Sequence, residues 1–367
     1  MEQYSGYWEN EMNRAFKEGH SFDVREYHDI LSPDFPDFLL RYIRIPLLQR
    51  LDGIGLLCGT DWTKLFNNRI YYSRLDHSIG TALIVWNFTH SKCQTLAALF
   101  HDVSTPVFSH VVDFKNGDAL NQESTENLTE VMINQDEELN FLLKSDGVYQ
   151  YEMRNYHMYP IADNDMPQLS ADRLEYMYPS GAALCAKWST SDIKENYNTI
   201  RVYRNEKGEK ELGFSNEDQA LIYTEKFCDI SLLLQHNEDK IVMQLMADII
   251  TKAIESGFIN ENDLYTMSES SIIELFDKKS NEESDKDFTR MYYTYRNMTQ
   301  VIHSEKFCNN AYNVRLDVKK RYVNPLVGDE DGNVRGRIYS VNDRARKIID
   351  DFKDFEDTKY GCTPWLK

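Results

Sequence analysis

The chain has 367 residues, of which 41% are hydrophobic and 13% aromatic, so it can bury a core in one large or two ordinary domains, and an intrinsically disordered chain is excluded. The 41 basic and 60 acidic residues give a formal net charge of −19, which opposes non-specific attraction to nucleic acid and to anionic membranes. Six cysteines without a C-x-x-C pair and the lack of an apolar run of about 18 residues predict reduced thiols, no membrane span and a cytoplasmic location.

The first strong helical pattern covers residues 78 to 88. Apolar residues recur there at positions 79, 82, 83 and 86, which is the spacing of one helix face. A second helix is predicted over residues 92 to 100, and it ends beside the dipeptide His101-Asp102. Pro106 then prevents the chain from continuing as a straight helix.

Helical patterns continue further along the chain. They cover residues 123 to 145 and residues 216 to 256, the latter with a break near 235 to 238, and another helix starts at Ala171. The charged stretch 277 to 287 predicts a polar loop or an exposed helix junction.

Two segments depart from the helical pattern. Residues 199 to 215 alternate about Lys207-Gly208 and predict a β-hairpin. Residues 318 to 327 and 337 to 341, joined by a Gly- and Asp-rich turn, predict a second strand pair before a last helix over 343 to 355. We therefore predict a mostly α fold with small β-hairpin insertions.

Four titratable residues lie near the ends of the predicted helices: His77, His101, Asp102 and Asp172. Two neutral imidazoles and two carboxylates form a mixed ligand set that suits a divalent ion with open positions for water and substrate. The charge of such an ion would offset the burial of Asp102 beside His101. The residues alone leave a second interpretation open, in which His77 is a helix-terminal histidine and Asp102 an N-cap.

Four stretches carry a family resemblance, and they are IRIPLLQRLDGIGLL, SRLDHSIGTA, AALFHDVSTPVFSHVVDF and ADRLEYMY. With these stretches in this order, the chain resembles the HD-domain metal-dependent phosphohydrolases, and among them the deoxynucleoside triphosphate triphosphohydrolases. The resemblance covers residues 40 to 180 and implies the helical HD-domain fold. We expect residues 1–195 to form the phosphohydrolase core. Residues 196–367 are then a helical extension with the hairpin and the C-terminal strand pair, packed on the core as one globular unit.

The resemblance also implies roles for individual residues. His77, His101, Asp102 and Asp172 match the ligands of one divalent metal ion, and the sequence leaves its identity open among Mg, Mn, Fe, Co, Ni and Zn. The family is commonly dimeric or larger, which implies a homo-oligomer.

Five further residues match family positions near the substrate. Arg74 matches an arginine that contacts phosphate, Arg173 and Tyr176 match residues that touch phosphate and sugar, and His110 and Asp113 match residues beside the catalytic apparatus. The resemblance thus implies catalytic roles for Asp113, Arg74 and His110, and substrate contacts for Arg74, His110, Arg173 and Tyr176. Without the resemblance, Arg74 is explained as a surface charge or a helix N-terminal salt bridge, and Tyr176 as a core aromatic residue. His110 is then explained by core packing, and Asp113 as a solvated loop carboxylate.

The chain departs from the family pattern at three places. Thr105 replaces a histidine that assists catalysis, and Asn121 stands where a second histidine is usual. Neither side chain has a proton that titrates near neutral pH. Leu56, with Leu57 and Cys58 after it, replaces a sugar-reading Gln-Leu-Gly stretch. The metal centre is therefore expected to be retained while the proton-donating and sugar-reading parts are rebuilt.

The retained residues predict a metal-dependent phosphohydrolase that acts on a nucleotide, with a deoxynucleoside triphosphate as one candidate, or on a related small phosphate ester. The ion would polarise a phosphoryl oxygen, Arg74 and Arg173 would neutralise developing charge, and Asp113 would orient or deprotonate the attacking water. Two alternatives stay open. One is a catalytically weakened nucleotide-binding sensor that keeps the metal, and the other is an HD-fold oxygenase, which requires a second iron.

Overall fold

The computed structural model describes residues 22–122, 124 and 128–366. Within them the fold is mostly helical with two small sheets, which confirms the predicted fold class. The helices before the first strand are α2 (Val24–Leu31), α3 (Leu39–Ile43), α4 (Pro46–Gln49), α5 (Arg74–Thr89), α6 (Lys92–Leu99), α7 (Val111–Lys115), α8 (Thr129–Gln135), α9 (Glu137–Asp146), α10 (Gln150–Met153), α11 (Ala171–Cys185) and α12 (Thr190–Tyr197).

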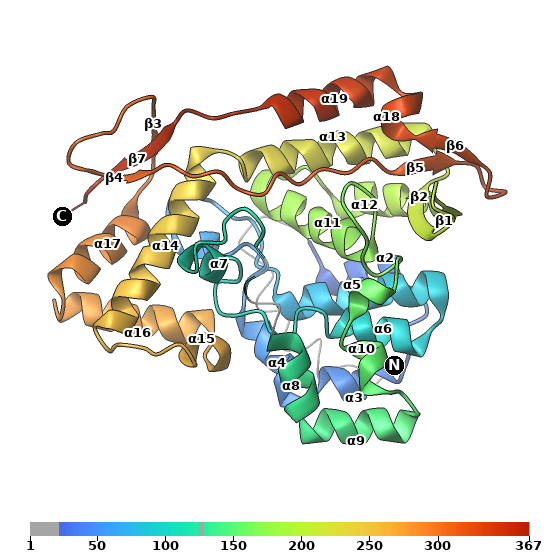
Figure 1. The fold of residues 1–367 in the computed structure, drawn as a ribbon, viewed down its shortest axis with the longest axis horizontal. Helices are drawn as coiled ribbons and strands as arrows, with labels where there is room; N and C mark the ends of the chain where they lie inside the picture. The colour runs from blue at the N-terminus through green and yellow to red at the C-terminus, as the bar shows by residue number, and fades with distance from the viewer. Residues whose placement is uncertain (1–21, 123, 125–127, 367) are drawn as a thin grey trace.

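The second half of the chain alternates helices with short strands (Figure 1). Its elements are β1 (Ile200–Arg204), β2 (Lys210–Phe214), α13 (Glu217–Leu233), α14 (Asn237–Glu255), α15 (Asp263–Thr266), α16 (Glu269–Asn281), α17 (Lys286–Asn297), β3 (Ile302–Ser304), β4 (Ala311–Val314), β5 (Leu326–Gly328), β6 (Val334–Arg337), α18 (Ile338–Val341), α19 (Asp343–Asp354) and β7 (Tyr360–Pro364).

Helix α5 runs through the larger hydrophobic cluster. It begins after Ser73, whose hydroxyl accepts the backbone N–H of Asp76 while the Asp76 carboxylate accepts the backbone N–H of Ser73. Its residues from Arg74 to Val85 are all buried, so the helix is covered on every side rather than along one stripe. The cap therefore fixes the first turn, which carries Arg74 and His77, relative to the core.

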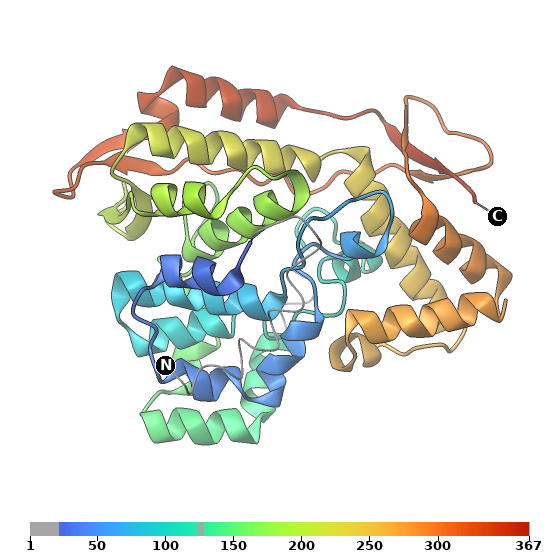
Figure 2. The same ribbon diagram turned by 180° about the vertical axis from the view of Figure 1, so that it is seen from behind.

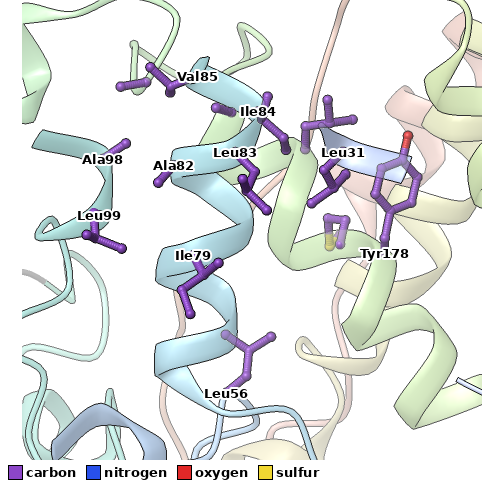
Figure 3. Close-up of a cluster of buried hydrophobic side chains, with 14 of the residues drawn as sticks. Leu31, Leu56, Ile79, Ala82, Leu83, Ile84, Val85, Ala98, Leu99 and Tyr178 are labelled. Carbon is purple, nitrogen blue, oxygen red and sulfur yellow. The ribbon is translucent and has the colours of Figure 1, made fainter. Parts of the chain in front are cut away.

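Apolar side chains from three helices surround α5. They come from α2, α6 and α11, and together with the predicted face of α5 they make a continuous core. The side chains labelled in Figure 3 are Leu31, Leu56, Ile79, Ala82, Leu83, Ile84, Val85, Ala98, Leu99 and Tyr178.

A second hydrophobic cluster is built mainly by α14, α16 and α17, helices that lie together on one side of the ribbon in Figure 2. Phe100 belongs to the first cluster and Phe108, only eight residues later, belongs to the second. The turns between α6 and α7 therefore cross from one cluster to the other. These turns carry His101 and Asp102, so the dipeptide lies where the two clusters meet.

The two sheets lie at opposite ends of the molecule (Figure 1). The predicted hairpin is confirmed, since β1 and β2 pair antiparallel from Ile200 opposite Phe214 to Arg204 opposite Lys210. Strand β5 pairs in parallel with β2 and antiparallel with β6. The order β1-β2-β5-β6 thus joins the C-terminal strand pair to the hairpin.

The predicted C-terminal strand pair is confirmed only in part. Strands β5 and β6 do pair, with Leu326 opposite Arg337. Residues 338–341, however, form helix α18, because Ile338 is fully buried in the larger cluster and tertiary packing outweighs the β preference of this stretch. Residues 318–325 form no strand, and they belong to an extended connection that runs alongside α13 (Figure 1).

Other helix predictions hold with local changes. The break between α13 and α14 is confirmed. Of the charged stretch 277–287, only residues 282–285 form a junction between helices, and its remaining residues belong to α16 and α17. The predicted helix over 123 to 145 consists of α8 and α9, which are separated at Asp136, whose carboxylate caps α9 through the backbone N–H of Leu139. Residues 123 and 125–127 of that prediction lie outside the described residues.

Sequence patterns missed the sheet β3-β7-β4 and helices α15 to α17. Strand β7 pairs with strands from Ile302 and Ala311 onward, far upstream in the chain, and strands of three to five residues are too short to show a period of two.

Both hydrophobic clusters draw residues from both sides of position 195. Phe214 and Ile349 lie in the first cluster, and Val107 and Phe108 lie in the second. The division into a core over 1–195 and an extension over 196–367 stays a prediction. Among the described helices, none combines the length and apolar composition that crossing a membrane requires.

Candidate active site

Four predicted ligand residues from three parts of the chain converge at one point. His77 comes from α5, His101 and Asp102 follow α6, and Asp172 lies in the first turn of α11. His77 Nε2 lies 3.1 Å from His101 Nε2, 3.1 Å from Asp172 Oδ1 and 3.8 Å from Asp102 Oδ2. His101 Nε2 lies 3.8 Å from Asp102 Oδ1 and 3.6 Å from Asp172 Oδ1. His77, His101 and Asp102 offer ligand atoms that all lie within 4.8 Å of one another, and Asp172 lies beside the two histidines.

Hydrogen bonds on the far sides of the two rings fix their tautomers. His77 Nδ1 lies 2.5 Å from the carboxylate of Glu175, and His101 Nδ1 lies 2.7 Å from the carbonyl oxygen of Ala98. A carbonyl or carboxylate oxygen only accepts, so each Nδ1 carries a proton and each Nε2 presents a lone pair. Two lone pairs 3.1 Å apart repel unless a proton or a cation lies between them. The donor set therefore fits a divalent metal ion.

Glu175 supports the candidate ligand His77, and sequence reasoning missed it. Its carboxylate is fully buried and accepts a second hydrogen bond, 2.5 Å long, from the hydroxyl of Tyr72. A Cβ on Gly80 would lie only 2.4 Å from Glu175 Oε1, which explains the glycine three residues after His77. The spacing of three residues from Asp172, on the same face of α11, is the signal that would have found Glu175.

The electrostatics of the set favour a bound cation. Burial lowers the pKa of His77, but Glu175 and Asp172 outweigh it and raise that pKa to about 10. Burial raises the pKa of Asp102, but Arg74 and the two histidines hold it well below its usual range. Without an ion, a proton on His77 therefore supplies the positive charge that the carboxylates require, and a metal ion would replace that proton.

Arg74 lies beside the ligand set. Its Nη1 donates to Asp102 Oδ2 at 2.7 Å, and its Nε donates to the hydroxyl of Ser109 at 3.0 Å. The side chain lines the cavity next to the ligands. Arg74 thus orients Asp102, and its contact with substrate phosphate stays a prediction.

His110 and Asp113 form a hydrogen-bonded pair, but only His110 lines the cavity. His110 Nδ1 lies 3.0 Å from Asp113 Oδ2, and the other carboxylate oxygen accepts the hydroxyl of Ser124 at 2.6 Å. Asp113 is fully buried, and in this structure its contact is with His110. Its predicted action on an attacking water stays a prediction.

Arg173 and Tyr176 also line the cavity. The Arg173 guanidinium donates to Asn164 Oδ1 at 2.9 Å and to Asp163 Oδ1 at 3.2 Å, so it is already held by protein acceptors. The Tyr176 ring lies edge-on to His77, with centroids 6.5 Å apart, and burial raises the pKa of its hydroxyl to about 12. Their predicted contacts with phosphate and sugar stay predictions.

The cavity has a volume of about 540 Å³ and includes residues that the sequence motifs did not indicate. Arg321 and Lys319 reach it from the connection between β4 and β5. Arg321 Nη2 donates to Gln122 Oε1 at 2.6 Å, and Lys319 Nζ donates to the backbone oxygen of Asn121 at 2.8 Å. A basic run at residues 319–321 in a strongly acidic chain is the one sequence signal for them.

Of the residues that depart from the family pattern, some line the cavity and others do not. Leu56, Leu57 and Cys58 line the cavity. Thr105 and Asn121 are not among the described residues of its wall; the backbone N–H of Thr105 donates to the Asp102 carbonyl at 2.9 Å instead. The side chains that replace the family histidines are thus not placed to take over proton transfer.

No protein-family model matches the chain. Over 258 residues it is 22% identical to a metal-dependent phosphohydrolase, cns2, from Cordyceps militaris, in a match that covers 69% of this chain and 72% of that protein. Over 132 residues it is 31% identical to YdhJ, an uncharacterized protein from Bacillus subtilis, in a match that covers 35% of this chain and 38% of that protein.

Two solved structures share the fold. A hypothetical protein from Aquifex aeolicus has a TM-score of 0.59 and 17% identity, over 89% of this chain and 92% of its own. A phosphohydrolase from Bacteroides thetaiotaomicron has a TM-score of 0.57 and 15% identity, over 91% of this chain and 97% of its own. The chain is thus a distant homologue of a metal-dependent phosphohydrolase and shares its fold with a solved phosphohydrolase. The resemblance to metal-dependent phosphohydrolases is confirmed at this level, and the HD type and the deoxynucleotide branch stay predictions.

Replacing Glu175 by Gln tests its support of His77. A glutamine at position 175 would present to His77 Nδ1 either its amide N–H₂ or a carbonyl oxygen that accepts more weakly than the carboxylate. The His77 tautomer is then no longer fixed, and metal affinity should fall about 10- to 100-fold. Competition with a fluorescent chelator for Mn²⁺ or Co²⁺ measures this. Glu269→Gln is the control, because Glu269 is equally buried but bonds to Trp62 and Gly55. Equal affinities for both variants and the wild type would contradict the assignment.

Proposed function

We propose that the chain is a metal-dependent phosphohydrolase that cleaves a nucleotide or a related small phosphate ester. One observation carries the proposal: the Nε2 lone pairs of His77 and His101 meet the carboxylates of Asp102 and Asp172 on the wall of a cavity that also holds arginine. Such an arrangement matches the chemistry of a hydrolytic metal site. Homology to metal-dependent phosphohydrolases supports the same reaction class.

His77, His101, Asp102 and Asp172 would hold the ion. When bound, it would polarise a phosphoryl oxygen and lower the pKa of a coordinated water towards neutrality. Arg74 keeps Asp102 ionised and oriented, and Glu175 keeps the His77 tautomer that points a lone pair inward. The four ligand residues determine where the substrate phosphate must lie, because the phosphoryl group must reach the ion that they would hold.

His110 is the proton-transfer residue of the proposal. Its Nδ1 is held by Asp113, which leaves Nε2 to exchange a proton with a molecule in the cavity. Burial lowers the pKa of His110 and outweighs Asp113, and Arg321 and Arg74 lower it further. The ring is therefore neutral at pH 7 and acts as a base. This role does not require the family histidines that Thr105 and Asn121 replace.

Positive charge for the phosphate comes from both halves of the chain. Arg74 lies beside the ligand set, and Arg321 and Lys319 face the cavity from the connection before β5. The uncharged Gln122 is the acceptor of Arg321, so a phosphate oxygen can displace it at little electrostatic cost. Arg173 is held by Asp163, and we assign it to shaping the wall rather than to neutralising charge.

The rest of the cavity suits an organic group. Leu57, Phe114, Leu233 and Met243 contribute apolar wall, and Tyr176 adds an aromatic face. A volume of about 540 Å³ lies in the range of small-molecule sites. A nucleoside fits this chemistry, and a deoxynucleoside triphosphate is one candidate. Leu56, Leu57 and Cys58 offer no side-chain amide to read a sugar hydroxyl, so discrimination between ribose and deoxyribose is not expected from them.

Replacing Asp102 by Ala tests the proposed function directly. Purified wild type should release phosphate from at least one member of a nucleotide panel with Mg²⁺, Mn²⁺, Co²⁺ or Ni²⁺, and a chelator should stop the reaction. Asp102→Ala should reduce the release below detection, because one ligand and the partner of Arg74 are lost. Asp229→Ala, on the exposed pair with Lys187, should behave as wild type. Binding without release by the wild type would favour the sensor instead.

Replacing Arg321 by Gln tests the assignment of His110. A base works only when neutral, so the rate falls as the pH drops through the pKa of His110, which lies below its ordinary value of 6.5. Removing the positive charge of Arg321 should raise that pKa, and the acid limb of the kcat/KM profile should move to higher pH. Lys207→Gln, on an exposed pair with Asp165, should leave the limb in place. An unchanged limb in Arg321→Gln would remove His110 from this role.

A further inference from the structure

A second group of histidines and carboxylates lies where α14 begins. His236 is the N-cap of α14, Glu238 lies in its first turn, and Asp357 lies in the segment before β7. One ligand atom from each of the three lies within 4.8 Å of the others. The three residues share no member with the candidate active site, and none is among the lining residues of the cavity.

The Asp357 carboxylate is fixed before any ligand arrives. Its side chain is 7% exposed. Oδ2 accepts the backbone N–H of Asn237 at 2.8 Å and lies 3.3 Å from His236 Nδ1, and Oδ1 accepts the backbone N–H of Thr358 at 2.6 Å. A carboxylate with its orientation set by backbone donors loses little conformational freedom when it binds an ion.

His303 of β3 adds a second imidazole to the cluster. Its Nδ1 lies 2.8 Å from Asp357 Oδ1 and its Nε2 lies 2.9 Å from Glu238 Oε1. The cluster therefore brings two imidazole rings and two carboxylates together from α14, β3 and the segment before β7.

We propose that His236, Glu238 and Asp357 form a second metal site for a divalent transition ion of the Zn²⁺ or Co²⁺ class. His303, which contacts both carboxylates, would lie beside the ion. Mixed imidazole and carboxylate ligands suit these ions better than Mg²⁺ or Ca²⁺. The charge of the ion would offset the charge of the Glu238 and Asp357 carboxylates.

The position of the site gives it a structural role. It joins the start of α14, strand β3 and the segment before β7, and β3 and β7 lie side by side next to α14 (Figure 1). Asp239, the residue after Glu238, lines the active-site cavity. An ion at the second site would therefore hold the first turn of α14 and, through it, one part of the cavity wall.

Metal counting in the full-length protein tests the proposal. The protein is stripped with a chelator, equilibrated with Zn²⁺ and desalted, and the bound metal is measured by mass spectrometry. The wild type should retain about two equivalents, Asp102→Ala and Glu238→Gln about one each, and the double variant close to none. In the Asp102→Ala background, Zn²⁺ should raise the melting temperature, and adding Glu238→Gln should abolish that rise. Glu225→Gln is the matched control, because Glu225 has a similar exposure, 38% against 33%, and pairs with Arg344.

The proposal is overturned if Asp102→Ala retains no Zn²⁺, or if Glu238→Gln retains as much as the Glu225→Gln control. Glutamine is close in size to glutamate and position 238 is partly exposed, so far-ultraviolet circular dichroism should show that Glu238→Gln folds. If it does not fold, His236→Gln replaces it in the same measurement of retained Zn²⁺. The measurement uses no substrate. Its failure would leave the proposed hydrolase intact, and failure of hydrolysis would leave the second site intact.

Discussion

The candidate site depends on one contact, the approach of two imidazole lone pairs to 3.1 Å. That contact exists because Glu175 and Ala98 hold the protons of the two rings on their far sides. Each support has a structural cause in turn. The capping box at Ser73 places His77 in the first turn of a buried helix, and Gly80 leaves room for the Glu175 carboxylate. Two Nε2 lone pairs at this distance repel unless a proton or a cation lies between them. The nearby carboxylates increase the attraction of the site for such a positive charge.

The site lies where two hydrophobic clusters meet. The ligand set is anchored on α5, α6 and α11 in the larger cluster. The His110 segment and α14 belong to the second cluster, and the connection with Arg321 closes the cavity from the C-terminal half. The cavity wall is thus built partly from the helices that carry the ligand set and partly from the second cluster and the C-terminal half.

The sequence predicts the fold class, the hairpin and the buried helix α5 because each depends on local periodicity or turn chemistry. It brings His77, His101, Asp102 and Asp172 together only through a family resemblance, since no local pattern relates residues about a hundred positions apart. Arg321, Glu175 and the β3-β7-β4 sheet escaped prediction because they act through contacts that arise only on folding. The position of Asp113 behind His110 likewise depends on burial, which the sequence does not display.

Anomalous diffraction from a crystal grown with Mn²⁺ or Co²⁺ tests the central claim most directly. The account predicts one strong anomalous peak within about 2.0 to 2.3 Å of the Nε2 atoms of both His77 and His101, with oxygens of Asp102 and Asp172 completing the ligands. The absence of a peak between the two rings, with the protein folded and the ion present in excess, would contradict it.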